Sequence, residues 1–218
     1  MARARSRGRT RAAGAAPGSA APLHAAPGSG ESRFEDGWHS RARRIASPNR
    51  DARPPGTAIE LVVLHNISLP PGRFSGGGVE ALFTNRLDPR AHPYYAGIAA
   101  LKVSAHFFLR RDGSLLQFVS CNERAWHSGV SRWRGRERCN DFSIGIEIEG
   151  ADAVPYTERQ YVRLARLLGE LSAAYPALRG DAGHDEIAPG RKTDPGPAFD
   201  WPRFLKSSGV PRAWRALG

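Results

Sequence analysis

The sequence has few cysteines and no long hydrophobic run, and both shortages exclude whole classes of protein. Only two of the 218 residues are cysteine, which is too few for a disulfide framework. Cys121 and Cys139 also lack the spacing of a paired metal motif. We therefore expect two free thiols, which suits a reducing compartment, with a single bridge as the alternative. No run of about 18 uncharged apolar residues occurs, so no membrane-spanning helix and no membrane partner are predicted.

Acidic residues are missing from the first 30 positions, where five arginines lie among Ala, Gly and Pro. They supply +5 of the formal net charge of +11. Such a segment buries too little apolar surface to offset its chain entropy, so we expect a disordered basic tail over residues 1–33. The folded domain is expected over residues 34–218.

The basic tail could suggest a nucleic-acid arm, but two observations argue against that function. No RRM, zinc-finger or helix-turn-helix pattern follows the tail, and no aromatic residues are interleaved with its arginines to stack on bases. The tail also lacks the apolar stretch of a secretory signal. We therefore expect a cytoplasmic protein that does not bind nucleic acid.

Hydrophobic patterning predicts a mixture of strands and helices without a strict βαβ repeat, so the fold class is α/β or α+β around a mostly β centre. Thr157 and Gln160 form a capping box at the start of the clearest helix. Strands are expected at 59–64, 105–110, 115–119 and 143–149, a short helix at about 79–85, and a long helix at about 158–175. The stretch 183–202 is rich in Pro and Gly and is expected to be a functional loop.

Histidines at strand ends are the first candidates for chemistry. His65, His106, His127 and His184 lie at or near predicted strand ends, although a histidine taken alone is more often a hydrogen-bonded structural residue. His65 and His184 combine with Asp194 into the usual ligand set of a catalytic zinc ion (Zn²⁺). A zinc ion there would lower the pKa of a bound water toward about 7.

Glu147 and Glu149 alternate with isoleucines on one predicted strand, so both point away from the apolar face. A solvated sheet face is the simpler interpretation for at least one of them. Gly145 on the same face would leave a gap beside Glu147 for a substrate, and a carboxylate near such a metal is a natural general base. Of Arg191 and Lys192, one is expected to be solvated while the other points at the metal, where it could stabilise an oxyanion.

Several long motifs resemble a known enzyme family. They are LVVLHNISLPPG, RAWHSGVSRWRGRERCNDFSIGIEIEG and GHDEIAPGRKTDPGPAFDW. The chain resembles the N-acetylmuramoyl-L-alanine amidases, a family related to phage lysozyme-type amidases and peptidoglycan recognition proteins, and within it the cytoplasmic enzymes that act on 1,6-anhydromuropeptides. The resemblance runs from about Gly37 to Phe204, and it implies a single domain with a central mixed β-sheet flanked by helices and a zinc groove on one face.

The resemblance also implies roles for individual residues. It makes His65, His184 and Asp194 the zinc ligands, Glu147 the residue that activates water, and Lys192 the oxyanion partner. The positions that it implies for substrate binding are Asn66, Lys102, Trp126 and Arg138.

The sequence departs from the family pattern at two places near the groove. Lys102 replaces an arginine, and Gly78-Val79 stands where an aromatic residue is expected. Arg can bind a carboxylate of a muropeptide through two parallel hydrogen bonds, whereas Lys acts as a point charge. Neither departure affects the expected metal ligands.

The implied activity is zinc-dependent hydrolysis of the amide between the lactyl group of N-acetylmuramic or anhydromuramic acid and L-alanine, in peptidoglycan recycling. The expected partner is a small anhydromuropeptide, and the protein is expected to be a monomer. Two alternatives remain. One is an amidase of the same fold that acts on polymeric peptidoglycan in the periplasm or as a lytic enzyme, and the other is a non-catalytic peptidoglycan-binding module.

Overall fold

The computed structural model describes Met1 and residues 33–208. The chain divides into two compact units, and all helices and strands of the described residues belong to the second, Ser32–Gly218. The tail predicted for residues 1–33 lies almost entirely outside the described residues.

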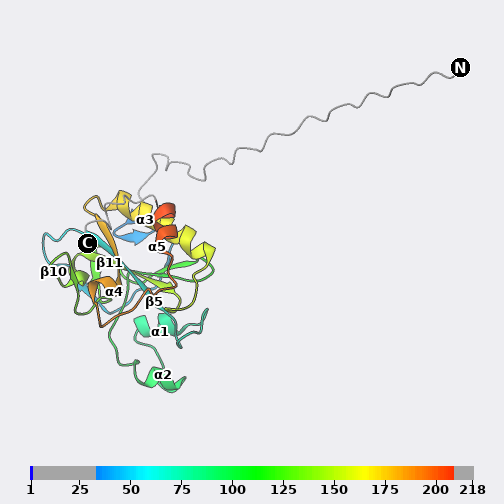
Figure 1. The fold of residues 1–218 in the computed structure, drawn as a ribbon. Coiled ribbons are helices and arrows are strands. Elements are labelled where there is room, and N and C mark those ends of the chain that lie inside the picture. Colours follow the sequence, from blue (N-terminus) through cyan, green and yellow to red (C-terminus); the bar gives the residue numbers. More distant parts are fainter. Residues whose placement is uncertain (2–32, 209–218) are drawn as a thin grey trace. The chain divides into compact units, whose positions relative to one another are not determined.

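A six-stranded mixed sheet forms the centre of this unit (Figure 1). Its strand order is β12-β5-β11-β6-β7-β3. Every neighbouring pair is parallel except β6 and β7, which form an antiparallel hairpin. The strands are β3 (Arg43–Arg44), β5 (Leu61–Ile67), β6 (Phe107–Leu109), β7 (Leu115–Gln117), β11 (Ser143–Glu149) and β12 (Gly180–Gly183). The mixed sheet flanked by helices confirms the predicted fold class.

Smaller elements surround the sheet. Three two-stranded antiparallel pairs are β1 (Phe34–Glu35) with β2 (Trp38–His39), β4 (Arg50–Ala52) with β8 (Glu123–Ala125), and β9 (Arg132–Trp133) with β10 (Arg136–Glu137). The helices are α1 (Gly78–Phe83), α2 (Pro93–Ala96), the 3₁₀ helix η1 (Cys139–Asp141), α3 (Glu158–Ala174), α4 (His184–Ile187) and α5 (Trp201–Ser208). None of the helices in the described ranges has the length and apolar character to span a membrane.

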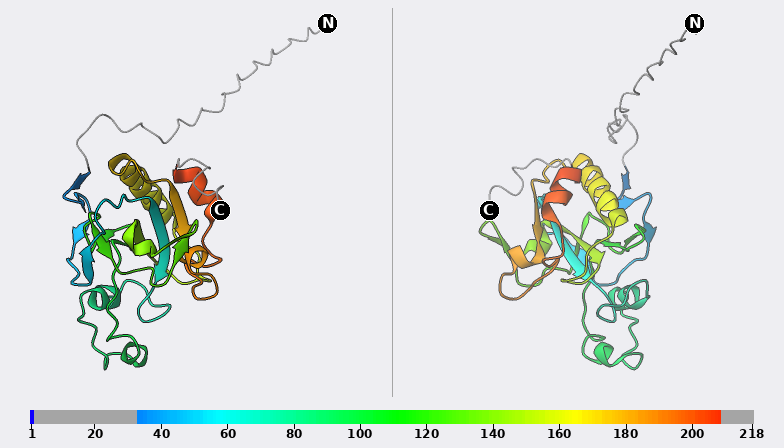
Figure 2. Two further views of the ribbon diagram at one scale, coloured as in Figure 1. Left: turned by 90° about the vertical axis from the view of Figure 1, so that its left-hand side faces the viewer. Right: turned by 45° about the vertical axis from the view of Figure 1, so that its right-hand side comes forward.

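Helices α3 and α5 pack together on one side of the sheet, in both orientations of Figure 2. Four leucines of α3 are buried against the isoleucines of β11, because the apolar residues of the helix recur on one face. The predicted capping box starts this helix: Thr157 Oγ1 accepts from the Gln160 N–H, and Gln160 Oε1 accepts from the Thr157 N–H. The long helix and its cap are therefore confirmed.

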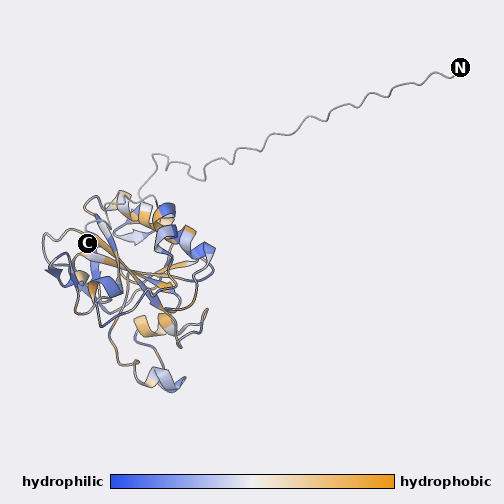
Figure 3. Ribbon diagram, in the orientation of Figure 1, coloured by the Kyte–Doolittle hydropathy of each residue, from blue (hydrophilic) through white to orange (hydrophobic). Residues whose placement is uncertain are grey.

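The opposite face of β5 carries Leu61, Val63 and His65, because side chains alternate along a strand. Leu61 and Val63 belong to a second apolar cluster with Ile187 of α4. Figure 3 shows the apolar colouring of the central strands and of α1, whose Val79 and Leu82 are buried in a third cluster. The polar residues at the C-terminal end of β5 are thus held by a rigid apolar base.

Three sequence-based expectations differ from the structure. Strand β5 begins at Leu61 and continues to Ile67, so His65 lies within it. The stretch 183–202 is not one loop, because His184 opens the short helix α4 and α5 begins at Trp201. All seven residues of β11 are buried, so neither Glu147 nor Glu149 lies on a solvated sheet face.

Candidate metal centre

Strand pairing brings the three predicted metal ligands together. Strand β12 pairs in parallel with β5, and Gly183 lies opposite Leu64. The next residue, His184, therefore emerges beside His65, while Asp194 reaches the same place from the loop after α4. His65 Nδ1 lies 2.9 Å from His184 Nδ1 and 3.1 Å from Asp194 Oδ2. The last two atoms are 3.0 Å apart, so the three form a nearly equilateral triangle.

This triangle suits a metal ion. Atoms bound at about 2.0–2.1 Å to a tetrahedral zinc ion lie about 3.3 Å from one another, close to the spacing of the triangle. His184 Nε2 lies 3.1 Å from the carbonyl oxygen of Ser128. A carbonyl only accepts, so neutral His184 carries its proton on Nε2 and presents the lone pair of Nδ1 to the cluster. Two imidazoles and a carboxylate fit zinc better than the all-oxygen shell of calcium or magnesium.

Burial also favours the metal-binding protonation states. His65 and His184 are almost fully buried, and burial lowers the pKa of His65 to about 4. Burial alone would raise the pKa of Asp194, but hydrogen bonds with His184 and His65 hold it below the usual value of a carboxyl group. Near neutral pH, His65 is therefore neutral and Asp194 is ionised, which are the forms that bind metals.

Glu147 lies directly beside the metal candidates. In the parallel pair of β11 and β5, Glu147 is opposite His65, so both side chains share one face of the sheet. Burial, followed by the negative charge of Asp194, raises the pKa of Glu147 well above its ordinary value, and Lys192 opposes this shift. Among the described residues, none donates a hydrogen bond to Glu147 Oε2. A buried carboxylate with a raised pKa and an unused oxygen is suited to proton transfer.

Arg191 and Lys192 are neighbours in sequence but have different surroundings. Arg191 Nη2 donates to the carbonyl oxygens of Ser128 at 2.7 Å and of Val130 at 2.6 Å, so it holds a neighbouring loop. Lys192 is exposed, and its positive charge lowers the pKa of both His65 and Glu147.

Asn66 connects the end of β5 to the loop that carries Asp194. Its amide Nδ2 donates to Asp152 Oδ1 at 2.8 Å and to the carbonyl oxygen of Pro195 at 3.0 Å. The amide nitrogen is therefore engaged within the protein, and it holds the backbone beside Asp194.

Trp126 and Arg138, two of the predicted substrate-binding residues, are linked by a network of ion pairs. Trp126 Nε1 donates to Asp51 Oδ1 at 3.1 Å, and Arg124 Nε donates to the same oxygen at 2.6 Å. Arg124 also bonds Asp141 Oδ1 at 2.6 Å, and Arg138 Nε lies 3.1 Å from Asp141 Oδ2. The network fixes the indole and leaves most of the Arg138 side chain exposed.

Lys102, the remaining predicted substrate-binding residue, is exposed. The N–H of Ser104, two residues later, donates to the carbonyl oxygen of Trp126 at 3.1 Å. The backbone thus holds the segment that carries Lys102 beside the segment of Trp126.

The structure adds His127 to the site, a residue that the sequence marks only as one of several histidines near strand ends. His127 Nδ1 lies 2.9 Å from His65 Nε2. Its ring also fills the space beside Gly145, where an added Cβ would lie 2.5 Å from His127 Cγ. The gap predicted there for a substrate is therefore wrong. The glycine makes room for an imidazole, and only the three-dimensional packing reveals this.

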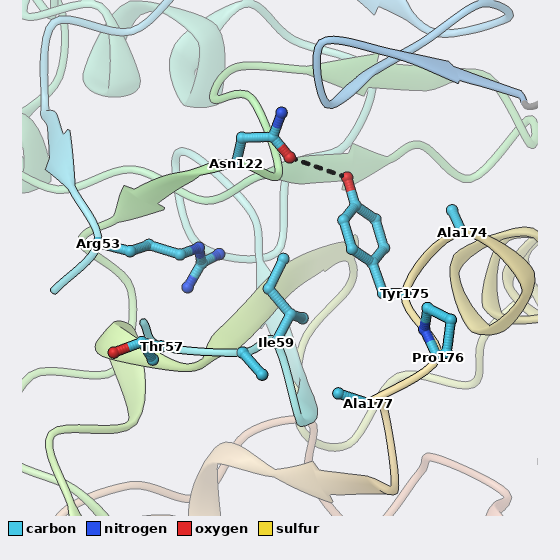
Figure 4. A pocket seen from close by; sticks show the side chains of 9 residues that line it. Arg53, Thr57, Ile59, Asn122, Ala174, Tyr175, Pro176 and Ala177 are labelled. Atoms are coloured by element: carbon cyan, nitrogen blue, oxygen red, sulfur yellow. Dashed lines mark hydrogen bonds between the residues drawn. The ribbon is translucent and has the colours of Figure 1, made fainter. Parts of the chain in front are cut away.

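A surface hollow elsewhere in the unit contains none of these residues. It is lined by Arg53, Thr57, Ile59 and Tyr175 among others (Figure 4). Thr57 and Ile59 precede the N-terminal end of β5, whereas His65 lies near its C-terminal end. The Arg53 guanidinium donates to the carbonyl oxygens of Cys121 and Ser143, so it is already bonded within the protein. The hollow has no cluster of catalytic groups.

Comparisons with known proteins identify the family to which the chain is similar. A family model described as N-acetylmuramoyl-L-alanine amidase matches residues 55–197. The 1,6-anhydro-N-acetylmuramyl-L-alanine amidase AmpD of Citrobacter freundii is 57% identical over 172 residues, which cover 78% of this chain and 92% of that protein.

Two solved structures are also similar. A crystal structure of a selenomethionine AmpD derivative aligns with a TM-score of 0.79 and 55% identity, covering 82% of this chain and 99% of that one. The Escherichia coli amidase AmiD, solved with anhydro-N-acetylmuramic acid–L-Ala–D-γ-Glu–L-Lys, aligns with a TM-score of 0.51 and 27% identity, covering 72% and 61% of the two chains. These matches confirm the family resemblance that the motifs indicate.

Proposed function

The chain belongs to the N-acetylmuramoyl-L-alanine amidase family, and we propose that it hydrolyses the amide between the lactyl group of anhydro-N-acetylmuramic acid and L-alanine in muropeptides. The observation that carries the proposal is the convergence of His65, His184 and Asp194 beside the buried Glu147. The relative from Citrobacter freundii, matched over nearly its whole length, is named for this reaction. The AmiD structure holds a substrate that contains this amide.

In this proposal, His65, His184 and Asp194 bind one zinc ion through two nitrogen atoms and one oxygen atom. The near-equilateral triangle of these atoms and their protonation states support it. When bound, zinc supplies Lewis acidity, which favours attack of water on an amide carbonyl.

Glu147 is proposed to move the proton. Its Oε2 atom takes a proton from the attacking water while the water oxygen forms a bond to the carbonyl carbon. The same oxygen then returns the proton to the amide nitrogen as the C–N bond breaks, so that the peptide leaves with a free amine. The raised pKa of Glu147 supports both steps, because an acid–base group works best when its pKa lies near the working pH.

Lys192 is proposed to stabilise the oxyanion that forms when water adds to the carbonyl. Its ammonium group acts on the pKa of both His65 and Glu147, so its field reaches the reacting centre. The preceding residue, Arg191, has a structural role, because it holds the Ser128–Val130 segment through hydrogen bonds to two carbonyl oxygens.

The proposed substrate groove contains Asn66, Lys102, Trp126 and Arg138. Arg138 suits a carboxylate of the stem peptide, because its exposed guanidinium can donate two parallel hydrogen bonds. Trp126 is positioned by Asp51 and offers its ring to the sugar or peptide. The proposal assigns these roles to a catalytic domain over residues 34–218 that acts as a monomer on small muropeptides and binds neither nucleic acid nor membrane.

A cytoplasmic location in peptidoglycan recycling is part of the proposal. Cys121 and Cys139 are both free and buried, as the sequence analysis predicts. Unpaired cysteines are typical of reducing compartments, which supports this location.

A comparison of two substrates tests the recycling function. Hydrolysis of a purified anhydromuropeptide is measured beside release of peptide from intact sacculi by the same enzyme preparation. Faster turnover of the anhydromuropeptide is expected. Faster release from sacculi would favour the polymeric substrate, and no hydrolysis of either substrate by zinc-loaded protein would favour a non-catalytic peptidoglycan-binding module.

A further inference from the structure

The His127 ring lies behind the proposed zinc ligand His65. The two rings meet edge to face, with an interplanar angle of 86° and centroids 5.0 Å apart. The His127 ring also packs against Gly145. Any side chain at position 145 would clash with the ring. Both contacts fix the plane and the position of the His127 imidazole.

The two ring nitrogens of His65 face different partners. Nδ1 faces His184 and Asp194, so this is the atom whose lone pair a metal requires. The proton of neutral His65 must then be on Nε2, which is buried and needs an acceptor. In the described part of the chain, His127 Nδ1 at 2.9 Å is the acceptor that Nε2 reaches.

His127 Nδ1 can accept this hydrogen bond if the proton of neutral His127 is on Nε2. His127 Nε2 lies 3.2 Å from Ser143 Oγ, which can accept a hydrogen bond from it when the His127 proton is on Nε2. His127 Nδ1 is then unprotonated and faces both His65 Nε2 and Ser128 Oγ, the latter at 2.9 Å. In the other tautomer, His127 Nδ1 would carry the proton and donate to His65 Nε2. The proton of His65 would then be on Nδ1, where it would block metal binding.

We propose that His127 is a positioning residue for the metal centre, whose Nδ1 accepts the Nε2–H of His65 and so fixes the tautomer and ring orientation that bind metal. This inference rests on the proposed zinc site. The next residue performs the same task for the second ligand, because the Ser128 carbonyl oxygen accepts from His184 Nε2. One dipeptide, His127-Ser128, thus orients both imidazoles. Acceptors of this kind strengthen metal binding by about 10- to 100-fold.

Zinc affinity of matched variants tests the proposal. The amide oxygen of Asn lies close to the position of His Nδ1, so His127→Asn retains the acceptor, whereas His127→Leu retains bulk without it. In chelator competition, His127→Leu is expected to bind zinc about 10- to 100-fold more weakly than wild type. His127→Asn is expected to stay within a few-fold of wild type. Thermal unfolding of the metal-free proteins checks that each variant is folded.

Ser143→Ala provides a smaller change if His127→Leu does not fold. It removes the acceptor of the His127 proton, and an intermediate loss of zinc affinity is expected. In the zinc-loaded wild type, a ¹⁵N–¹⁵N coupling across the hydrogen bond between His65 Nε2 and His127 Nδ1 is also expected in NMR spectra.

Three results would overturn the inference. They are unchanged zinc affinity in folded His127→Leu, equal losses in the Asn and Leu variants, and absence of the NMR coupling. Each leaves the proposed zinc site intact, because wild-type protein still binds the metal. Failure of wild-type protein to bind zinc would overturn the zinc site and this inference together.

Discussion

Glu147 and Glu149 are two residues apart on β11 but have different surroundings. Glu149 Oε1 accepts from the Ser75 N–H at 2.5 Å, and Oε2 accepts from the Arg111 N–H at 3.0 Å. Both oxygens of Glu149 are therefore used to hold loops. Glu147 has an oxygen atom that no described residue contacts by a hydrogen bond. The difference supports the proposed role of Glu147 in proton transfer, whereas Glu149 has a structural role.

Replacing Glu147 separates the chemistry from metal binding. Glu147→Ala is expected to retain zinc and to lower turnover of anhydromuropeptide by about 10²- to 10⁴-fold, the usual contribution of a positioned acid–base group. Steady-state kinetics and metal analysis on the same sample measure both quantities. A near-wild-type rate with zinc retained would require another base.

Residue types explain which parts of the site the sequence predicts. Two histidines near strand ends and an aspartate in a loop, together with the family motifs, are sufficient to nominate His65, His184 and Asp194. The contribution of His127 depends on which nitrogen atom faces which neighbour, and on a glycine from another strand that makes room for its ring. Neither leaves a spacing pattern in the sequence.

Among the helices and strands, patterning predicts the long elements and the hairpin of β6 and β7, whose strands have three residues each, and it misses several of the shortest ones. Helix α3 is found from its apolar period and its capping box, and β11 from its alternating isoleucines. Strands of two residues, such as β9, are too short to show a period. The short helix α4 is missed because its four residues lie in a stretch rich in Pro and Gly.

The capping box of α3 is expected to stabilise the fold independently of the metal site. Thr157 Oγ1 accepts from the Gln160 N–H and donates to the Arg111 carbonyl oxygen at 2.8 Å. Thr157→Ala is expected to lower the free energy of unfolding by about 1–2 kcal/mol, whereas Thr157→Ser retains the hydroxyl and most of the stability. Urea unfolding measures the difference. Equal stability of the Ala and Ser variants would show that the cap contributes nothing.

At the scale of the whole molecule, buried histidines link stability to pH. Burial, assisted by the nearby Arg53 charge, lowers the pKa of His106 to about 3, whereas an unfolded histidine titrates near about 6.5. The folded state therefore favours neutral His106. Its contribution to stability is complete above the unfolded pKa and is lost as the pH falls toward the folded pKa. As the pH falls from 7.5 to 5, protonation linked to this single group lowers the free energy of unfolding by about 2 kcal/mol.

Urea unfolding of metal-free protein at these two pH values measures this loss. His106→Asn is the matched variant, because its amide oxygen can still accept from the Gly145 N–H that bonds His106 Nδ1. The fall in stability between the two pH values is expected to be about 2 kcal/mol smaller in the variant. An unchanged fall would show that His106 does not remain neutral in the folded state.

The distribution of charge predicts that the arginine-rich segment is dispensable for catalysis. Every proposed site residue lies between 65 and 194, and the first 30 residues carry +5 of the net charge of +11. Deleting residues 1–30 is expected to leave kcat/KM for anhydromuropeptide unchanged. Steep salt-dependent DNA binding that disappears with the deletion would instead assign the segment a nucleic-acid role.

The proposed activity depends on one zinc ion held by His65, His184 and Asp194. Its most direct test measures bound zinc and anhydromuropeptide hydrolysis together in wild type, His65→Ala and Asp194→Ala. We predict about one zinc ion per wild-type chain, as expected for a single tetrahedral site, with cleavage that releases a peptide beginning with L-alanine. Both ligand variants are predicted to lose zinc and activity in parallel. Wild-type rates in folded Asp194→Ala, or full activity of protein stripped of metal, would contradict a catalytic zinc site at these residues.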